Sequence, residues 1–336
     1  MNSILNDKNV LSLINKDENY IIFNDGVAIR QNIQENEIEI EIADNYDIYE
    51  LCKHNRTAKE EDIVNNSRFT TVVNIYKSGT LKIIRFNDKQ QYSNLVFNVK
   101  KDVEIDIVNI YYDVTTNTNA LVDVICSKRS NVKYTSVQTV KQEFSEYVNF
   151  YVDEKVTLDI NSLGLNENKV SNCTNVYMYK PLSYVTVNNS IINSTSLTQR
   201  YDYNVYHWYN DTTSNLINYA ICKDSSELNI NSNGIIKKGC ARSKLSQKSK
   251  GIILDLTSAI SANPLLQIDE FDVEANHGAS IGAIDESDLF YLMSRGLPRE
   301  QSQNLIINGF FNPYLSKLHD EGLIKHISEA IKEHID

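Results

Sequence analysis

Short segments in which apolar and polar residues alternate dominate the first two thirds of the chain, as in EIEIEIAD (37–44) and VEIDIV (103–108). They recur about every ten residues, and no helical pattern separates them between about residues 70 and 275. Since successive side chains of a strand point to opposite faces, each segment predicts a strand with one buried face and one wet face. This order argues against an α/β sheet and predicts a mainly β fold, which is a sandwich, a barrel or a β-solenoid.

Turn residues change along the chain. Eight of the 11 glycines lie at or after Gly234, and three of the four prolines are Pro264, Pro298 and Pro313. The earlier strands are therefore expected to be joined by turns of Asn, Asp and Ser, whose side chains stabilise turns. No clear internal repeat accompanies the strands, so periodicity alone does not single out the solenoid.

The C-terminal part of the sequence predicts helices. Asp285 can cap a helix that Gly296 is placed to end. Pro298 is expected at the first position of a second helix, which Pro313 interrupts, and a third amphipathic stretch follows Gly322. The apolar stripes expected on these helices are Leu289, Leu292 and Met293, then Leu305, Ile306, Gly309 and Phe310, then Leu323, Ile324, Ile327 and Ile331.

Charge and composition limit the classes of partner and location. The chain carries 33 Lys and Arg against 44 Asp and Glu, a net charge of −11, which disfavours nucleic-acid binding. No segment approaches the roughly 20 apolar residues of a membrane span, and Met1–Glu18 lacks the apolar core of a secretion signal. The five cysteines are scattered singly, which disfavours disulfides or a zinc site and favours the reducing cytoplasm: Cys52, Cys126, Cys173, Cys222 and Cys240.

Catalytic motifs are missing from the sequence. The stretch from Gly234 to Gly239 has the glycine spacing of a phosphate-binding loop but lacks its Lys and Ser or Thr. A β-solenoid carbohydrate-active enzyme would need clustered carboxylates, for which Asp153, Glu154 and Asp159 are only isolated candidates. We therefore expect a chain without enzymatic activity.

Two histidines are candidate functional residues. His207 stands beside the only tryptophan, in YHWYNDTTSN, and is interpreted either as a hydrogen-bonded sheet residue or as part of a site. His277 lies where the β pattern gives way to the helical one, and Gly278 and Gly282 follow it closely. Neutral imidazole is a good ligand for iron, although a lone histidine is more often structural.

The run from Leu245 to Phe311 resembles the C-terminal core of the SufB/SufD family of iron–sulfur cluster assembly proteins. In that family a P-x-L-x-I-x-x-x-D-V step, an H-[GAE]-A segment and a helix reading D-x-L-F-Y-L-x-S-R-G-[IL] follow in this order. Here they are PLLQIDEFDV (264–273), HGA (277–279) and DLFYLMSRGL (288–297), the last one residue shorter at its start. A weaker similarity covers YIIFNDGVAI (20–29) and His207 with the TSN step at 213–215.

The resemblance implies a right-handed parallel β-helix with a small C-terminal α-helical domain. The expected domains are an N-terminal segment at 1–68, partly helical or irregular with an opening strand, a β-helix core at 69–283 and a helical domain at 284–336. The implied function is that of a non-catalytic scaffold subunit of the SufBCD complex. It would pair with SufB and dock the ATPase SufC, which binds the ATP.

The resemblance also carries functional residues onto this sequence. His277 of the HGA motif is the expected cluster-assembly residue at the SufB interface and a candidate metal ligand. The nascent iron–sulfur cluster would be shared transiently with SufB, and this chain would hold none alone. Beyond the resemblance, we hypothesise that the segment Asp285–Phe311 transmits the movement of SufC, with Tyr291, Arg295 and Gly296 as its contacts.

Two branches of the family are distinguished by residues around the histidine. SufB proteins usually read H-E-A and carry a cysteine on the preceding strand region, whereas this chain has Gly278 and no cysteine in Gly251–Asn263. Both features favour the SufD branch. Ala275 stands where some SufD proteins have a cysteine, so a thiolate ligand would come from the partner. A SufB-like homodimeric scaffold, with Cys240 or Cys222 as substitute, stays an alternative.

Overall fold

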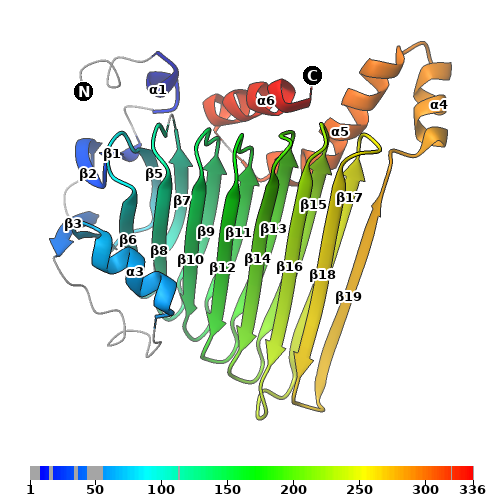
Figure 1. The fold of residues 1–336 in the computed structure, drawn as a ribbon. Coiled ribbons are helices and arrows are strands. Elements are labelled where there is room, and N and C mark those ends of the chain that lie inside the picture. Colours follow the sequence, from blue (N-terminus) through cyan, green and yellow to red (C-terminus); the bar gives the residue numbers. More distant parts are fainter. Residues whose placement is uncertain are drawn as a thin grey trace.

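A computed structural model describes residues 8–14, 18–33, 37–43, 56–112, 114–318 and 320–335. Its strands form two sheets that face each other, and helices lie against their outer surfaces (Figure 1). Cys52, one of the five singly scattered cysteines, lies outside the described residues.

The strands alternate between the two sheets along the chain. The first sheet contains β1 (Asn19–Asn24), β2 (Val27–Asn32), β5 (Gly79–Phe86), β7 (Glu104–Tyr111), β9 (Asn131–Gln138), β11 (Thr157–Gly164), β13 (Tyr184–Asn193), β15 (Thr213–Cys222), β17 (Ser243–Ile253) and β19 (Val273–Gly282). The second contains β3 (Ile38–Ala43), β4 (Thr70–Ile75), β6 (Tyr92–Val99), β8 (Thr118–Cys126), β10 (Phe144–Val152), β12 (Val170–Met178), β14 (Thr198–His207), β16 (Glu227–Ile236) and β18 (Ala259–Ile268).

From β4 onward, each strand pairs in parallel with the strand two places along the chain. β10, for example, pairs with β12 from Phe144 opposite Val170 to Val152 opposite Met178 without a register shift. Each turn of the chain therefore adds one strand to each sheet, which is the topology of a parallel β-solenoid. This confirms the predicted mainly β solenoid with a small C-terminal helical part. Among the described strands, only the pairs β1–β2 and β3–β4 are antiparallel.

The interior between the sheets is mostly apolar. Its core runs from Ile21 near the N-terminus to Ile230 on β16 and includes Phe97, Tyr134 and Phe150. These side chains occupy every second position of their strands, as the alternation in the sequence predicted. The turns often use non-glycine residues with positive φ, such as Asp102 and Arg129, which agrees with the scarcity of glycine in this part of the chain.

Helices cover the outer faces of both sheets. On the first sheet, α1 (Lys8–Ser12), α5 (Arg299–Leu315) and α6 (Glu321–Ile335) form a second apolar core. Phe311 of α5 and Ile327 of α6 are fully buried there. On the second sheet, α3 (Ala58–Asn66) is fixed by a capping box of Thr57 and Glu60, and Glu60 accepts a hydrogen bond from Asn149 at 2.7 Å.

The helix boundaries confirm some expectations and correct others. Asp285 caps α4 (Glu286–Ser294), and Gly296 follows that helix with φ of 95°. Pro298 is not the first helical residue, because it is the N-cap of α5. Pro313 does not interrupt α5, which continues to Leu315 around it.

The buried faces of the three helices also agree only in part with the apolar stripes expected from the sequence. On α4 only Leu289 is buried, and Met293 is exposed. The buried face of α5 comprises Ser302, Ile307, Phe311 and Tyr314 rather than the expected stripe, because the first sheet contacts the helix from that side. On α6 the expectation holds for Leu323, Ile327 and Ile331.

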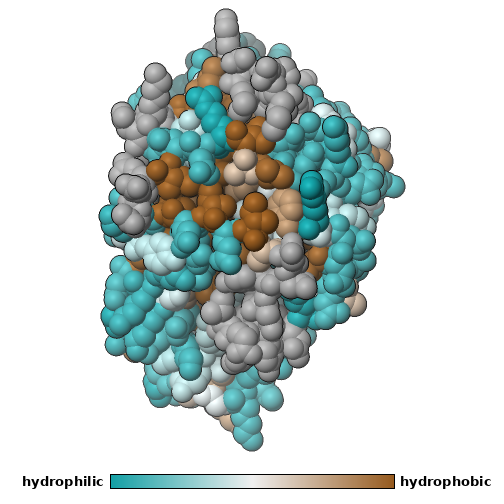
Figure 2. Space-filling model, turned by 90° about the vertical axis from the view of Figure 1, so that its left-hand side faces the viewer, coloured by the Kyte–Doolittle hydropathy of each residue, from teal (hydrophilic) through white to brown (hydrophobic). Residues whose placement is uncertain are grey.

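Figure 2 views the N-terminal end of the solenoid, where hydrophobic side chains gather between hydrophilic ones. Val27 of β2 and Ile42 of β3 are among the exposed apolar residues of this end. The strands from β4 to β19 span Thr70–Gly282, and β1 already pairs with β5. The domain boundaries at 68/69 and 283/284 stay a prediction. None of the helices in the described ranges is long and apolar enough to cross a membrane.

Candidate functional site at the open end of the solenoid

The C-terminal end of the solenoid leaves two long strands at the sheet edges. β18 is the last strand of one sheet and β19 the last strand of the other, and each contains ten residues. Among the described strands, β18 pairs only with β16, and β19 only with β17. Both therefore present one edge of unpaired backbone donors and acceptors.

Exposed apolar side chains surround this end. Leu265 and Ile268 of β18 are 47% and 40% exposed, although they lie within a strand. Leu256, in the turn before β18, and Phe271, in the turn after it, are fully exposed. Large apolar side chains gathered at an unpaired sheet edge are typical of a surface that binds another protein.

His277 lies in the middle of β19 and is exposed. Its neighbour in the parallel register is Gln247 of β17, which is only 2% exposed. Since side chains in register on adjacent strands share a face, His277 continues the interior face of the solenoid at the point where the solenoid stops. Ala275 and Ala279 flank it on that face, so small side chains leave the imidazole accessible.

Gln247 is a residue that the sequence analysis did not single out. Neither its Nε2 nor its Oε1 has a hydrogen-bond partner in the described structure, although both atoms are buried. A buried side-chain amide without any hydrogen-bond partner is uncommon in folded proteins. Only the register places it beside His277, thirty residues further along the chain, so no sequence signal identified it.

The residues expected to contact an ATPase lie on and just after α4, away from His277. Tyr291 is 57% exposed and its neighbour Phe290 is 74% exposed. The Arg295 guanidinium lies over the Tyr291 ring, 5.3 Å from its centroid, and Gly296 makes the turn into α5. In Figure 1, α4 projects beyond the last strands of the solenoid. The structure thus places these three residues on or just after α4 and brings Arg295 and Tyr291 into contact.

The four cysteines of the described ranges are free thiols, and three of them are buried. Cys126, Cys173, Cys222 and Cys240 form no disulfide. Burial raises the pKa of the Cys222 thiol to about 11 and that of Cys173 to about 12. Cys240 donates to the His207 carbonyl oxygen at 3.2 Å. These thiols stay protonated near neutral pH, and none of them lies on β17, β18 or β19.

His207 is a structural residue. Its two ring nitrogens lie 2.7 Å from the hydroxyls of Thr212 and Ser214. Burial lowers its pKa from 6.5 to about 4, so the imidazole is neutral. With both nitrogens occupied inside the solenoid, no nitrogen is left for a ligand.

The carboxylates considered for a carbohydrate-active enzyme do not form a pair. Glu154 is bound to Lys128 at 2.5 Å, and Asp153 accepts a hydrogen bond from the backbone of Glu154. Asp159 binds Lys317 of the segment after α5 at 3.0 Å, as well as the Thr186 hydroxyl. Within the part of the chain that the structure describes, no group of three or more His, Cys, Asp or Glu side chains is placed to hold a metal ion.

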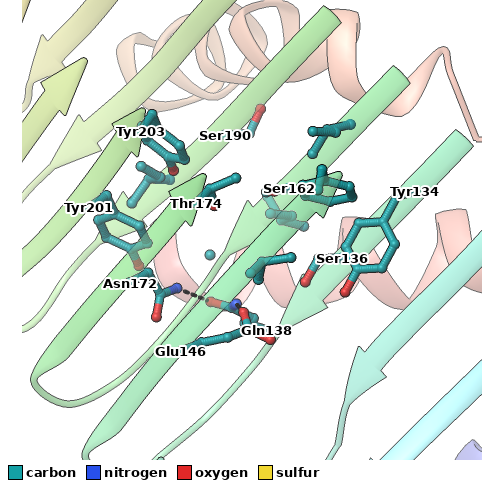
Figure 3. A pocket seen from close by; sticks show the side chains of 16 residues that line it. Tyr134, Ser136, Gln138, Glu146, Ser162, Asn172, Thr174, Ser190, Tyr201 and Tyr203 are labelled. Atoms are coloured by element: carbon teal, nitrogen blue, oxygen red, sulfur yellow. Dashed lines mark hydrogen bonds between the residues drawn. The ribbon is translucent and has the colours of Figure 1, made fainter. Parts of the chain in front are cut away.

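A small cavity lies between the two sheets, where Figure 3 shows polar side chains from β9 to β14 pointing toward one another. Gln138 donates to Glu146 at 2.5 Å, and Asn172 donates to Gln138 at 2.8 Å. The cavity volume of about 20 Å³ leaves room for about one water molecule. It is too small for a cofactor or a sugar, so this hydrogen-bonded cluster serves the fold.

Comparisons with known proteins identify the family of this chain. A family model described as SUF system FeS cluster assembly, SufBD core domain, matches residues 83–310. The iron-sulfur cluster assembly protein SufD of Bacillus subtilis (strain 168) is 26% identical over 297 residues, which cover 84% of this chain and 67% of that protein.

Two further relatives carry the same name. SufD of Plasmodium falciparum (isolate 3D7) is 22% identical over 290 residues, covering 84% of this chain and 20% of that protein. SufD of Escherichia coli (strain K12) is 31% identical over 87 residues, covering 26% of this chain and 21% of that protein. The chain thus spans about two thirds or less of the length of these relatives.

Proposed function

This chain belongs to the SufBD core family, and we propose that it is a non-catalytic scaffold subunit of iron–sulfur cluster assembly, of the SufD branch. In this proposal it pairs with a SufB-like solenoid through its open end and docks a SufC-like ATPase through α4. The single observation that carries the proposal is the uncovered end formed by β18 and β19, with His277 in its middle.

The unpaired edges favour a partner that is itself a β-solenoid. Two edges of ten residues each, one from each sheet, match the end of a second two-sheet solenoid better than a single peptide strand. At the opposite end each sheet finishes with an antiparallel strand, β2 or β3, instead of a bare parallel strand. The exposed Leu265 and Phe271 would be buried when the partner adds its strands.

The contribution of this chain to the cluster would be a half-site. His277 can offer an imidazole nitrogen at the interface. By contrast, Cys126, Cys222 and Cys240 are buried and Cys173 is partly buried. Thiolates for the nascent cluster would therefore come from the SufB-like partner. The cluster is cargo that both subunits hold transiently. The free cysteines fit the reducing cytoplasm, where we place the protein.

The α4 surface favours docking of a second kind of partner. Phe290, Tyr291 and Met293 are all exposed on a helix of nine residues. The ATPase would bind ATP and pull on α4 when it changes conformation. Since α5 connects α4 to the outer face of the first sheet, such a movement can reach the solenoid.

An anaerobic affinity purification of this chain from its own cells tests the proposal. We expect a P-loop ATPase and a cysteine-bearing solenoid protein to co-purify with it. Phe271→Ser should lose the solenoid partner, whereas Leu182→Ser, at another exposed turn, should keep it. Arg295→Glu should lose only the ATPase, with Arg200→Glu, an exposed arginine of β14, as its control.

Each part of the proposal has an outcome that contradicts it. Recovery of the chain alone would contradict the scaffold role. Recovery of a homodimer that binds a cluster would favour the SufB-like alternative. Unchanged ATPase recovery with Arg295→Glu would exclude the proposed contact on α4.

A further inference from the structure

Two rows of amide side chains cross the outer face of the second sheet. In the first row, each asparagine donates from Nδ2 to the residue in register on the previous strand of the sheet, over 2.7–3.0 Å; its members are Asp123, Asn149, Asn175, Asn204 and Asn233. In the second row, Asn231 donates to Asp202 at 2.6 Å, and Asn263 donates to Asn231 at 3.0 Å. Residues that flank the amides, such as Val176 and Val205, belong to the core between the sheets, so the amides point outward. Each row is therefore a ladder of hydrogen bonds that runs across successive strands.

An aspartate at the start of each row fixes the direction of its ladder. An ionised carboxylate can only accept hydrogen bonds, so the asparagine beside it turns Nδ2 toward the carboxylate and Oδ1 toward the next strand. Each later asparagine then meets an oxygen on one side and must present its own Nδ2 to it. Asp202 is paired with Arg200 at 2.8 Å, and Asp123 with Arg56 at 2.8 Å. The amide oxygens of both ladders therefore point toward the open end of the solenoid.

Asn263 brings the second ladder to the open edge with an oxygen that lacks a donor. It lies on β18, is exposed, and uses Nδ2 for Asn231 and, at 3.3 Å, for the Ser261 hydroxyl. Among the described residues, none donates a hydrogen bond to its Oδ1, which faces away from β16. The first ladder does not reach the edge, because the residue in register with Asn233 on β18 is Leu265. Of the two rows, only the second thus offers an acceptor to a neighbouring strand.

A strand added to the edge of β18 would place one of its side chains directly opposite Asn263. Adjacent strands lie about 4.8 Å apart, and side chains in register share a face. In both ladders this spacing is bridged by asparagines, which donate to the earlier strand and accept from the later one. Two residues along β18 on the same face, Leu265 is 47% exposed and would be buried by an apolar neighbour. The edge therefore fits a strand that carries an amide and an apolar residue two positions apart.

We propose that Asn263 selects the solenoid partner by the chemistry of one side chain. The partner strand that pairs with β18 carries an asparagine or glutamine in this row, and its amide donates to Asn263 Oδ1. A strand without a donor at this place would leave the oxygen buried and unsatisfied, which disfavours wrong partners and shifted registers. This inference deepens the function proposed above, on which it rests, by naming the chemistry of the partner's edge strand.

Binding of the partner to variants of the full chain tests the proposal. The solenoid protein that co-purifies with the wild-type chain is isolated and titrated with each variant. Asn263→Leu keeps the approximate size of the side chain and removes the oxygen, and it should bind about tenfold more weakly. Gln267→Leu is the matched control, because Gln267 is an exposed amide on the same face of β18 outside both ladders, and it should bind as the wild-type chain does. Thermal unfolding checks that both variants fold.

Two further measurements separate a directed ladder from a simple contact. Asp202→Ala removes the carboxylate that fixes the direction, two strands away from the edge, and should weaken binding about threefold. Arg200→Gln keeps that carboxylate and should leave binding unchanged. Each asparagine and glutamine of the partner's edge strands is also replaced by leucine. One of these changes should weaken binding to the wild-type chain but not to Asn263→Leu.

The outcomes distinguish this inference from the proposed function. If the wild-type chain recovers no solenoid partner, the proposed function fails and the inference fails with it. If the partner is recovered but binds Asn263→Leu as tightly as Gln267→Leu, only the inference fails. It also fails if no amide of the partner couples to Asn263, or if Asp202→Ala binds like the wild-type chain.

Discussion

A chain of buried hydrogen bonds joins Arg85 to Glu146 across the interior of the solenoid. Arg85, which is 4% exposed, donates from Nη1 to the Tyr111 hydroxyl at 2.6 Å, and this hydroxyl donates to Glu146 Oε1 at 2.6 Å. Gln138 donates to the second carboxylate oxygen. Burial raises the pKa of Glu146, and the bond from Tyr111, the charge of Arg85 and the bond from Gln138 lower it in part.

Substitution of Glu146 by Gln removes the charge that compensates Arg85 and preserves the volume of the side chain. An uncompensated charge in a protein interior costs about 3–5 kcal/mol of unfolding free energy. With a slope of about 3 kcal/mol per molar urea, the unfolding midpoint should fall by about 1 M or more. Arg85→Met alone should also be destabilising, because it leaves the carboxylate buried without its cation.

The double variant Arg85→Met/Glu146→Gln tests whether the two groups act together. If they do, the loss of unfolding free energy in the double variant should be about 1–3 kcal/mol smaller than the sum of the losses in the two single variants. Glu143→Gln is the matched control, since Glu143 is exposed in the turn before β10 and contacts only Lys169 at 3.7 Å among charged groups. Urea unfolding followed by circular dichroism measures all four variants. A loss below about 1 kcal/mol in Glu146→Gln, or additive costs in the double variant, would refute the reasoning.

Two further predictions concern His207 and Gly234. Because burial lowers the pKa of His207 from 6.5 to about 4, its contribution to stability is present above pH 6.5 and is lost as the pH falls toward 4, by about 3 kcal/mol. Urea unfolding at several pH values should show that the free energy of unfolding falls less with decreasing pH in His207→Gln than in the wild-type chain. The same pH dependence in both proteins would contradict this prediction. Gly234→Ala should cost about 1–3 kcal/mol in thermal unfolding because its Cβ overlaps Leu245, whereas Gly278→Ala, with nothing within 4 Å, should be nearly neutral.

The elements themselves could be predicted from local sequence. Alternation in segments such as VEIDIV (103–108) predicted strands, because a strand with one buried face needs an apolar residue at every second position. Asp285 and Gly296 marked the ends of α4 through local backbone chemistry, a side-chain cap and a positive φ. These features depend on neighbours a few residues away, so the sequence alone contains them.

The helical faces could be predicted only in part. The pattern on α6 has one apolar stripe, and Ile327 and Ile331 are buried as expected. On α5 several stripes fit the helical period, and contact with the first sheet selects the one that contains Ile307 and Phe311, while Leu305 is exposed. Local periodicity cannot choose among such stripes, because the choice depends on which surface the helix contacts.

The candidate site at the open end of the solenoid could likewise be predicted only in part from the sequence. The HGA motif pointed to His277, but its exposure at the end of the interior face follows from the solenoid ending at β19. Gln247 lies beside His277 only through the register of β17 and β19. Alternation in the sequence determined which residues of each strand share a face. Only the tertiary structure decided which strands are neighbours, because parallel pairing is made by backbone hydrogen bonds that are the same for every residue pair.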